Sequence, residues 1–396
     1  MNKPLEGLRI ISLSQYGAGP YATLQLADLG AEVIKIEQKS TNGDVSRQVI
    51  PYAENGDSLF FQSLNRNKKS ITLDVKSEKG REIFYELVRE SDAVFNNFRG
   101  DVPEKLGITY EQLKHINPQI VTCSLSGFGT SGSLRSEPAY DYLLQAKLGH
   151  MSLTGEPEGV PSKYGLSIID FSTGMMAALG LMVGIYQAKS KGIGSDIDVS
   201  LYDTAASVMN YIATWHLNRD YEPKRTGYSA HPTLVPSQLF PTKDGNVVVM
   251  CNKEKFFQIL CERLGKPELA EDGRYKDFEN RFKNKETLTP KLISLFKEKD
   301  TKYWIDKLKG KVPIAPVNTV KEALEDPFIK EREMIVEYEH PTFGLLKMLG
   351  TPIKVKDYKP EYKAGPSMGE HNTDIYQNLL NLTPEEIKAL QNDSTI

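Results

Sequence analysis

The stretch LRIISLSQYGAGPYATLQLADLGAEVIKIE, residues 8–37, decides the fold of this chain. Its first six residues form an apolar run, which is typical of a buried strand. A glycine-rich turn follows, and Pro20 is suited to the first turn of a helix. Gly30 can end that helix, and residues 32–37 predict a second strand. A strand, a helix and a second strand in this order predict a parallel sheet covered by helices.

The same alternation continues along the chain. Strands are expected at residues 70–74, 93–97 and 120–125, with helices at 78–90 and 110–116. The longest apolar helical pattern covers residues 170–189 and predicts a core helix. From about residue 221 Pro, Tyr and charged residues dominate, which predicts a second domain with more exposed surface. The predicted fold class is α/β, a Rossmann-like parallel-sheet domain with a second, smaller α+β domain.

The composition argues against several classes of function. The 396 residues include 49 Lys and Arg against 52 Asp and Glu, a net charge of -3, which argues against a nucleic acid partner. The three cysteines and six histidines show no metal-ligand spacing, so no metal site is expected. The sequence begins without a secretory signal pattern and has no uninterrupted apolar run of about 18 residues. We therefore expect a cytoplasmic protein with no membrane partner.

The glycine-rich turn admits two interpretations. Gly17, Gly19 and Ala22 imitate a dinucleotide-binding fingerprint, and Glu37 at the end of the next strand could receive ribose hydroxyls. Against this, Pro20 removes a backbone donor from the turn, and such turns also occur for packing alone. A tight turn serving another ligand or none is the alternative.

Basic residues gather near the predicted strand ends. Residues 66–69 (RNKK), Lys76, the triplet Asn97-Phe98-Arg99 and Lys105 would suit a phosphorylated nucleotide, because open parallel sheets bind ligands at strand ends. Phe98 adds an aromatic face that could pack on a base. A solvated lysine-rich surface is the alternative interpretation.

Asp170 lies in an apolar setting at the start of the predicted core helix. A carboxylate there could serve as an N-cap. It could also be a desolvated nucleophile that attacks a carbonyl and forms an acyl intermediate. Asp141, twenty-nine positions earlier, is a possible second carboxylate of the same site.

Several ordered motifs run through nearly the whole chain: Ala18-Gly19-Pro20, residues 26–37, residues 67–74, Asn97-Phe98-Arg99, Leu106-Gly107, residues 126–129, residues 138–141 and residues 369–371. Together they resemble the class III CoA-transferases, the family of formyl-CoA transferase and the carnitine CoA-transferases. The resemblance implies that the glycine-rich turn serves coenzyme A and not a nicotinamide cofactor.

The resemblance also implies roles for individual residues. Asp170 falls on the acyl-accepting aspartate, Asp141 on the acidic residue that assists it, and Gly17 on the turn whose amides stabilise an oxyanion. The implied CoA contacts are Tyr16, Leu73, Lys76, Asn97, Phe98, Arg99 and Lys105. An acyl-CoA and a carboxylic acid are the implied substrates, exchanged through an aspartyl-CoA thioester without a tightly bound cofactor.

For the architecture, the resemblance implies an interlocked homodimer. Each chain would have a large Rossmann-like CoA-binding domain that begins with residues 1–224. A small domain over residues 225–330 would follow, and residues 331–396 would return to the large domain.

The chain departs from the family at three places. Gln38 stands where many members have an Arg that contacts CoA. Gly17 replaces the Gln of formyl-CoA transferase and residues 226–229 replace its run of glycines, which argues against formyl-CoA and oxalate as substrates. Tyr140 replaces the His of the α-methylacyl-CoA racemases, which share the fold, so transfer is favoured over racemisation. A 2-methylacyl-CoA racemase and a nicotinamide-dependent oxidoreductase are the alternative functions.

Overall fold

The computed structural model describes residues 3–396, which form two compact units. The larger unit holds the chain up to Leu148, then Gly165–Met209 and Phe328–Ile396. The smaller unit holds Gly149–Tyr164 and Asn210–Pro327. These boundaries differ from the predicted domains, since residues 210–224 pack with the smaller unit, and the assignment of domains stays a prediction.

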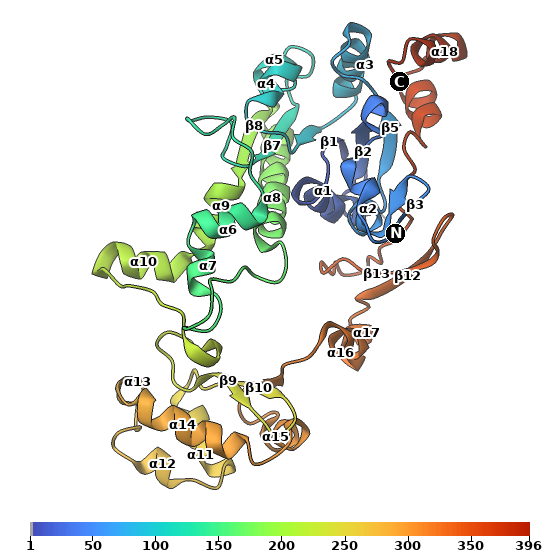
Figure 1. Ribbon diagram of the computed structural model, residues 1–396. Coiled ribbons are helices and arrows are strands. Elements are labelled where there is room, and N and C mark those ends of the chain that lie inside the picture. The colour runs from blue at the N-terminus through green and yellow to red at the C-terminus, as the bar shows by residue number, and fades with distance from the viewer. Residues whose placement is uncertain (1–2) are drawn as a thin grey trace. The chain divides into compact units, whose positions relative to one another are not determined.

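A six-stranded sheet forms the centre of the larger unit (Figure 1). Its neighbouring strands all run parallel, in the order β5-β2-β1-β6-β7-β8. The strands are β1 (Arg9–Leu13), β2 (Glu32–Glu37), β5 (Lys69–Thr72), β6 (Ala93–Asn96), β7 (Val121–Ser126) and β8 (Ser195–Ser200). The direction of chain progress reverses between β1 and β6, which is where such sheets bind ligands at the carboxyl ends of their strands. The predicted α/β parallel-sheet fold is confirmed.

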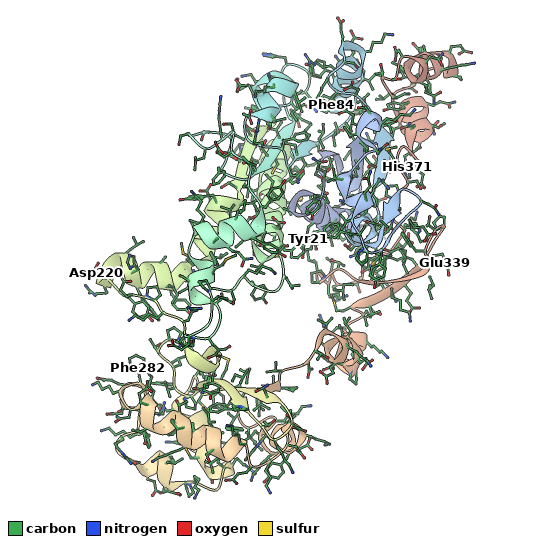
Figure 2. All side chains as sticks on the ribbon, in the orientation of Figure 1. Tyr21, Phe84, Asp220, Phe282, Glu339 and His371 are labelled. Carbon is green, nitrogen blue, oxygen red and sulfur yellow. The ribbon has the colours of Figure 1, made fainter. Side chains whose placement is uncertain are left out.

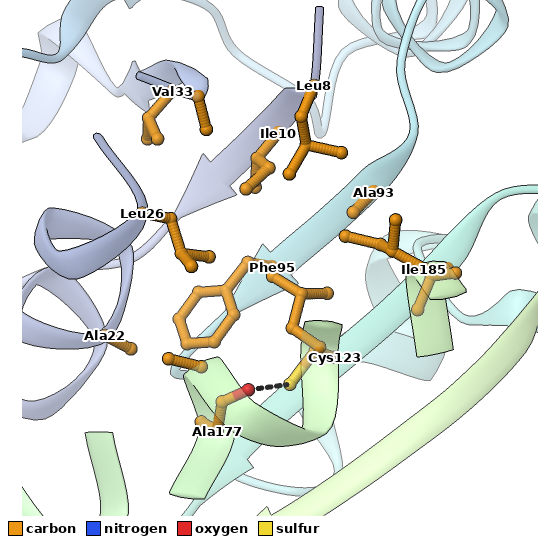
Figure 3. Close-up of a cluster of buried hydrophobic side chains, with 14 of the residues drawn as sticks. Leu8, Ile10, Ala22, Leu26, Val33, Ala93, Phe95, Cys123, Ala177 and Ile185 are labelled. Atoms are coloured by element: carbon orange, nitrogen blue, oxygen red, sulfur yellow. Dashed lines mark hydrogen bonds between the residues drawn. The ribbon is translucent and has the colours of Figure 1, made fainter. Parts of the chain in front are cut away.

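Successive side chains of β1 point to opposite faces of the sheet and enter different hydrophobic cores. Ile10 shares one core with Phe95 of β6 and with side chains of α1 (Ala18–Asp28) and α8 (Ile168–Lys191), as Figure 3 shows. Ile11 shares the other with Phe84 of α3 (Glu78–Arg89), which is labelled in Figure 2. The sheet is therefore covered by apolar side chains on both faces, as the alternation of strands and helices predicts.

Helix α8 has a buried face made of small and apolar residues and a second face that is exposed. Thr173, Ala177, Leu181 and Ile185 recur every fourth residue and are buried, because α8 packs on α1, β7 and β8. Within residues 3–396, α8 is the one helix long and apolar enough by length and composition to cross a membrane. Core helices of soluble proteins pass the same test.

The edge strand β5 is covered by a segment about 300 residues later in the chain. His371 donates its backbone N–H to the Ser70 carbonyl at 2.9 Å, and the Thr72 N–H donates to the Asn372 side chain at 2.9 Å. The Tyr376 hydroxyl donates to the Thr72 carbonyl. These bonds satisfy backbone groups that an edge strand otherwise leaves open.

Shorter elements complete the larger unit. They are β3 (Ala53–Glu54), β4 (Asp57–Ser58), α2 (Leu59–Asn65), α4 (Val102–Leu106), α5 (Tyr110–Leu113), α6 (Asp141–Lys147), α9 (Leu201–Val208), β12 (Ile335–His340), β13 (Gly344–Leu349), α18 (Pro384–Asn392), the short 3-10 helices Lys39–Thr41 and Val45–Gln48, and a π-helix at Asp374–Leu379. The helix expected at 110–116 is shorter than predicted, because the Ile116 N–H bonds to the Leu113 carbonyl in a turn.

The smaller unit has its own core, built on a three-stranded antiparallel sheet in the order β11-β10-β9. Its elements are α7 (His150–Leu153), α10 (Asn210–Arg219), a 3-10 helix at Gly227–Ser229, β9 (Ser237–Pro241), β10 (Asn246–Met250), α11 (Glu254–Arg263), α12 (Glu268–Glu271), α13 (Phe278–Lys283), α14 (Lys285–Phe296), α15 (Thr301–Leu308), β11 (Ile314–Pro316) and α16 (Val320–Glu325), with α17 (Pro327–Glu331) at its boundary. In its interior, the fully buried Arg281 donates to the backbone carbonyls of Val235 and Tyr275.

We expect Gly174→Ala to lower the thermal stability of the protein. A methyl group on Gly174 would lie 2.7 Å from the Ala18 carbonyl oxygen, so α1 and α8 would have to separate. Such overpacking costs about 1–3 kcal/mol. Differential scanning calorimetry measures the loss.

The matched control for that variant is Gly180→Ala in the same helix. There the added methyl meets side-chain carbons of Ile197 at 3.0 Å and Val199 at 3.8 Å and no backbone atom. Alanine also favours the helix by about 1 kcal/mol over glycine. Equal losses in the two variants would contradict the role assigned to the contact between α1 and α8.

Candidate active site

A cavity of about 480 Å³ opens at the carboxyl ends of β1, β6 and β7. Its lining comes from the turn after β1 (residues 15–18), the end of β6 (residues 97–99), the end of β7 (residues 125–127), residues 137–140, Val45, Leu201 and Asp170 near the start of α8. This is the point in the sheet where strand order reverses, so the topology alone marks it as a binding site.

The turn after β1 brings the main chain close to the Asp170 carboxylate. A methyl group added at Gly17 would lie 3.2 Å from Asp170 Oδ2, so glycine leaves this approach open. Tyr16 adopts the left-handed backbone conformation, with φ +68°, which is uncommon for a residue other than glycine. Helix α1 begins directly afterwards, and the first backbone N–H groups of a helix have no partner within it.

The contact between α1 and α8 fixes the turn relative to Asp170. The ring of Tyr21, labelled in Figure 2, lies 4.8 Å from the ring of Phe171, measured between centroids. Gly174 allows the backbone of α8 to approach Ala18 closely. The two helix starts therefore meet beside the cavity.

Asp141 binds the first backbone amides of α8. Its Oδ2 accepts hydrogen bonds from the N–H groups of Ile169 at 2.7 Å and Asp170 at 3.0 Å, and its Oδ1 accepts one from the Gln145 side chain. The N-cap position itself is Ser167. The interpretation of Asp170 as the helix N-cap is therefore wrong, because the amides at this helix start bond to Asp141.

Asp170 is a weaker acid than an ordinary aspartic acid. Burial and the neighbouring Asp141 carboxylate raise the pKa of Asp170 to about 7. The Ile169 and Asp170 amides at this helix start do not offset the cost of burying the charge, since Asp141 accepts both of them. Asp170 is therefore a carboxylate that changes its protonation state near neutral pH.

A second cavity, of about 320 Å³, lies next to the first and shares Gln15, Val45 and Phe98 with it. Leu73 and Gln38 line this second cavity. Together the two cavities form a continuous set of lining residues from the end of β5 to Asp170.

The structure brings most of the predicted site residues together, but not all. The first cavity is lined by Tyr16, Gly17, Asn97, Phe98, Arg99 and Asp170, and the second by Leu73 and Phe98. Lys76 is exposed beyond β5, and Lys105 pairs with Asp101; neither lines these two cavities. Arg99 also pairs with Asp101, at 2.7 Å, and keeps about half of its side chain exposed.

The basic run at residues 66–69 does not belong to the site. Residues 66–68 precede β5 and Lys69 is its first residue, so the run lies at the amino edge of the sheet and not at the carboxyl edge. Arg66 forms a buried ion pair with Asp28 at 2.6 Å, and Lys69 bridges Glu32 and Asp374. These residues are structural, so the prediction that they bind phosphate is wrong.

Glu37 lines the second cavity, but its carboxylate is occupied by partners within the protein. It is buried and accepts hydrogen bonds from Arg47 and Ser70. Gly19 has a packing role, because a methyl group there would lie 2.8 Å from side-chain carbons of Asn97 and Ser14. Neither Glu37 nor Gly19 therefore supports the dinucleotide-binding interpretation of this turn.

Sequence reasoning missed a buried ion pair behind the turn. Lys35 and Asp44 lie 2.7 Å apart with side chains that are 1% and 0% exposed. A lysine inside the apolar strand at 32–37 was the available signal, because a buried charge requires a partner.

No metal centre is found in the part of the chain that the structure describes. Among residues 3–396, His, Cys, Asp and Glu side chains form no group of three or more that could hold a metal ion.

Comparisons with known proteins agree with one another. The family model described as CoA-transferase family III matches residues 5–372. Succinyl-CoA:glutarate CoA-transferase from Homo sapiens is 35% identical over 98% of this chain and 89% of its own length. Acetyl-CoA:oxalate CoA-transferase from Acetobacter aceti is 37% identical over 90% of each chain.

A solved structure of a CAIB/BAIF family protein from Brucella suis is 34% identical, with a TM-score of 0.81 over 96% of this chain and 100% of that one. Its similarity extends over both compact units described above. The chain therefore belongs to CoA-transferase family III and is an enzyme that transfers CoA between an acyl-CoA and a carboxylate.

Proposed function

We propose that the transfer proceeds through a covalent intermediate on Asp170. The observation that carries this proposal is a partly buried carboxylate with a pKa near 7, placed in the cavity against the glycine turn at the head of α1. A carboxylate that has lost part of its hydration attacks a thioester carbonyl more readily.

The proposed reaction balances without water or an added cofactor. An Asp170 oxygen attacks the donor thioester carbonyl, which forms a mixed anhydride and releases CoA thiolate. The thiolate attacks the aspartyl carbonyl, which gives an aspartyl-CoA thioester and frees the donor acid. The acceptor carboxylate attacks that thioester and releases the thiolate again. The thiolate then attacks the acceptor's carbonyl carbon in the new anhydride, so acyl-CoA leaves and the Asp170 carboxylate is restored.

Backbone amides at the turn are placed to stabilise the oxyanions of these steps. Gly17 lies beside Asp170, and the amides at the start of α1 have no partner within the helix. Pro20, the third residue of α1, has no N–H to offer. Asp141 holds the start of α8 and so positions Asp170, which is the assisting role that we propose for it.

For CoA we propose that the nucleotide lies toward the second cavity and the thioester toward the first. Leu73 and Phe98 provide apolar contacts there, and Tyr16, Asn97 and Arg99 lie on the way to Asp170. Lys76 and Lys105, outside both cavities, would bind phosphates. Gln38 donates to Asp74 at 3.3 Å and supplies no cation to the nucleotide.

For the acceptor we propose a short dicarboxylic acid. The names of several relatives, succinyl-CoA:glutarate and succinyl-CoA:mesaconate CoA-transferases, specify dicarboxylates. A racemase is disfavoured, because Tyr140 is a poorer proton shuttle near neutral pH than the histidine that this reaction favours. We keep the cytoplasm as the proposed location.

We also propose that two copies of the chain form the interlocked homodimer that the family resemblance implies. Support comes from the outer face of α8, where Met175, Met176, Leu179, Val183 and Tyr186 are 47–77% exposed. Soluble monomers rarely expose contiguous apolar surface of this kind. A second copy of the chain is the proposed cover.

Asp170→Asn should abolish acyl-enzyme formation and reduce transfer by several orders of magnitude, because the variant removes the covalent route. Asp170→Glu should also fail to form the acyl-enzyme, since the longer side chain misplaces the attacking oxygen.

Incubation with succinyl-CoA, hydroxylamine trapping and peptide mass analysis should locate the modification on Asp170 in the wild type. Asp196→Asn is the matched control, because Asp196 is a partly buried carboxylate with a raised pKa outside both cavities. Transfer at the wild-type rate by Asp170→Asn ends the proposal.

Acyl-enzyme formation should depend on pH with an apparent pKa of about 7, because only ionised Asp170 attacks. The same group makes folding less favourable as pH rises from about 4 to 7, since the folded state holds a proton that the unfolded state has released. Asp170→Asn should therefore raise the melting temperature more at pH 8 than at pH 5, by about 2 °C or more. Rapid-quench acylation and calorimetry at both pH values test this. A flat acylation profile from pH 5.5 to 8.5 would contradict it.

Sedimentation velocity should show a dimer down to nanomolar concentration, because interlocked chains cannot separate without partial unfolding. Leu179→Glu with Val183→Glu should disturb assembly, since each charge would be buried under the second copy. A folded monomer at nanomolar concentration would refute the dimer. Flotation of the wild type with lipid vesicles would instead assign the exposed α8 face to a membrane.

A further inference from the structure

The buried Lys35–Asp44 ion pair contacts the active-site turn with both of its members. Lys35 Nζ donates to the Ser14 carbonyl, and Asp44 Oδ1 accepts the Tyr16 N–H at 3.0 Å. The pair therefore holds the main chain on both sides of Gln15, immediately before Gly17.

This main chain needs an external restraint. Tyr16 has a φ of +68°, a left-handed conformation that is unfavourable for a residue with a Cβ. The Asp44 carboxylate is itself fixed, because Oδ1 also accepts the Ser46 N–H at 2.8 Å and the Ser46 hydroxyl at 2.7 Å. Lys35 and these hydrogen bonds hold the pKa of Asp44 at about 2 despite burial, so Asp44 stays charged throughout the working pH range.

We propose that Lys35 and Asp44 are positioning residues of the transfer reaction, which set the Tyr16–Gly17 main chain at its distance from the Asp170 carboxylate. This inference rests on the proposed role of Asp170. Neither side chain lines the first cavity, which holds Asp170. Both line the second cavity, but with 1% and 0% of their side chains exposed they present almost no surface to a ligand there. They act through the backbone that they bind.

A comparison with another buried pair separates positioning from simple stabilisation. Asp28 and Arg66 form an ion pair of similar burial, 0% and 4% exposed, at the other end of α1. Asp28 bonds to the side chains of Arg66 and Asn67 and not to the turn. Loss of either pair should affect stability, whereas only loss of Lys35–Asp44 should affect chemistry.

The test uses Asp44→Asn, the double variant Lys35→Met with Asp44→Asn, and Asp28→Asn as the matched control. The double variant removes both charges and leaves none unpaired, which folded proteins often tolerate. Three quantities are measured for each: the single-turnover rate of acyl-enzyme formation from succinyl-CoA, its pH profile, and the Kd of free CoA. We expect acylation to fall about tenfold or more in both Asp44 variants, with a shifted pH profile and a CoA Kd within about threefold of the wild type. Asp28→Asn should leave the acylation rate and pH profile unchanged.

Each outcome decides the proposal. Wild-type acylation by a folded Asp44 variant overturns it, while the loss of acylation in Asp170→Asn still supports the proposed function. Acylation by Asp170→Asn removes the proposed function itself. An equal loss in Asp28→Asn assigns the effect to general stability and overturns positioning. Failure of the double variant to fold, when Asp28→Asn folds, also overturns it, because the pair is then required for folding.

Discussion

The close packing of α1 on α8 is the constraint on which the site depends. Because Gly174 has no side chain, the start of α8 can lie against Ala18, and this places Asp170 beside Gly17. The parallel sheet supplies the frame, since β1 ends directly before this turn and β6 ends across from it. A residue larger than glycine at position 174 would separate the carboxylate from the main chain that faces it.

Three aspartates near this contact have different properties because their surroundings differ. Asp44 is paired with Lys35 and accepts several hydrogen bonds, so its charge is stable. Asp141 accepts two backbone amides and holds a helix in place. Asp170 is left with burial and a neighbouring carboxylate, and these raise its pKa. The carboxylate with the raised pKa is therefore the one whose nearby amides are bound by another acid.

Local patterns predicted the sheet and much of the site, because strands and glycine-rich turns can be recognised from residues that are neighbours in the sequence. The family resemblance implied that Tyr16, Gly17, Phe98 and Asp170 belong to one site, and these residues do line adjoining cavities. Partners far apart in sequence could not be predicted. A run of basic residues has the same sequence whether it binds phosphate or forms an ion pair with Asp28. Likewise, no residue next to Asp44 in the sequence indicates that the Asp44 side chain binds the Tyr16 amide. The roles assigned from the family resemblance stay predictions until Asp170 and its neighbours are tested.

The cover on β5 has a consequence for the order of events during protein synthesis. Residues 371–376 bond to the outer edge of β5, which the ribosome completes about 300 residues earlier. Until they emerge, β5 presents open hydrogen-bonding groups, which invite pairing with other nascent chains. The smaller unit is translated within this interval, up to Pro327, and can fold around its own core while the outer edge of β5 is still uncovered. The time needed to translate residues 73–376 therefore sets how long the exposed edge must be protected in the cell.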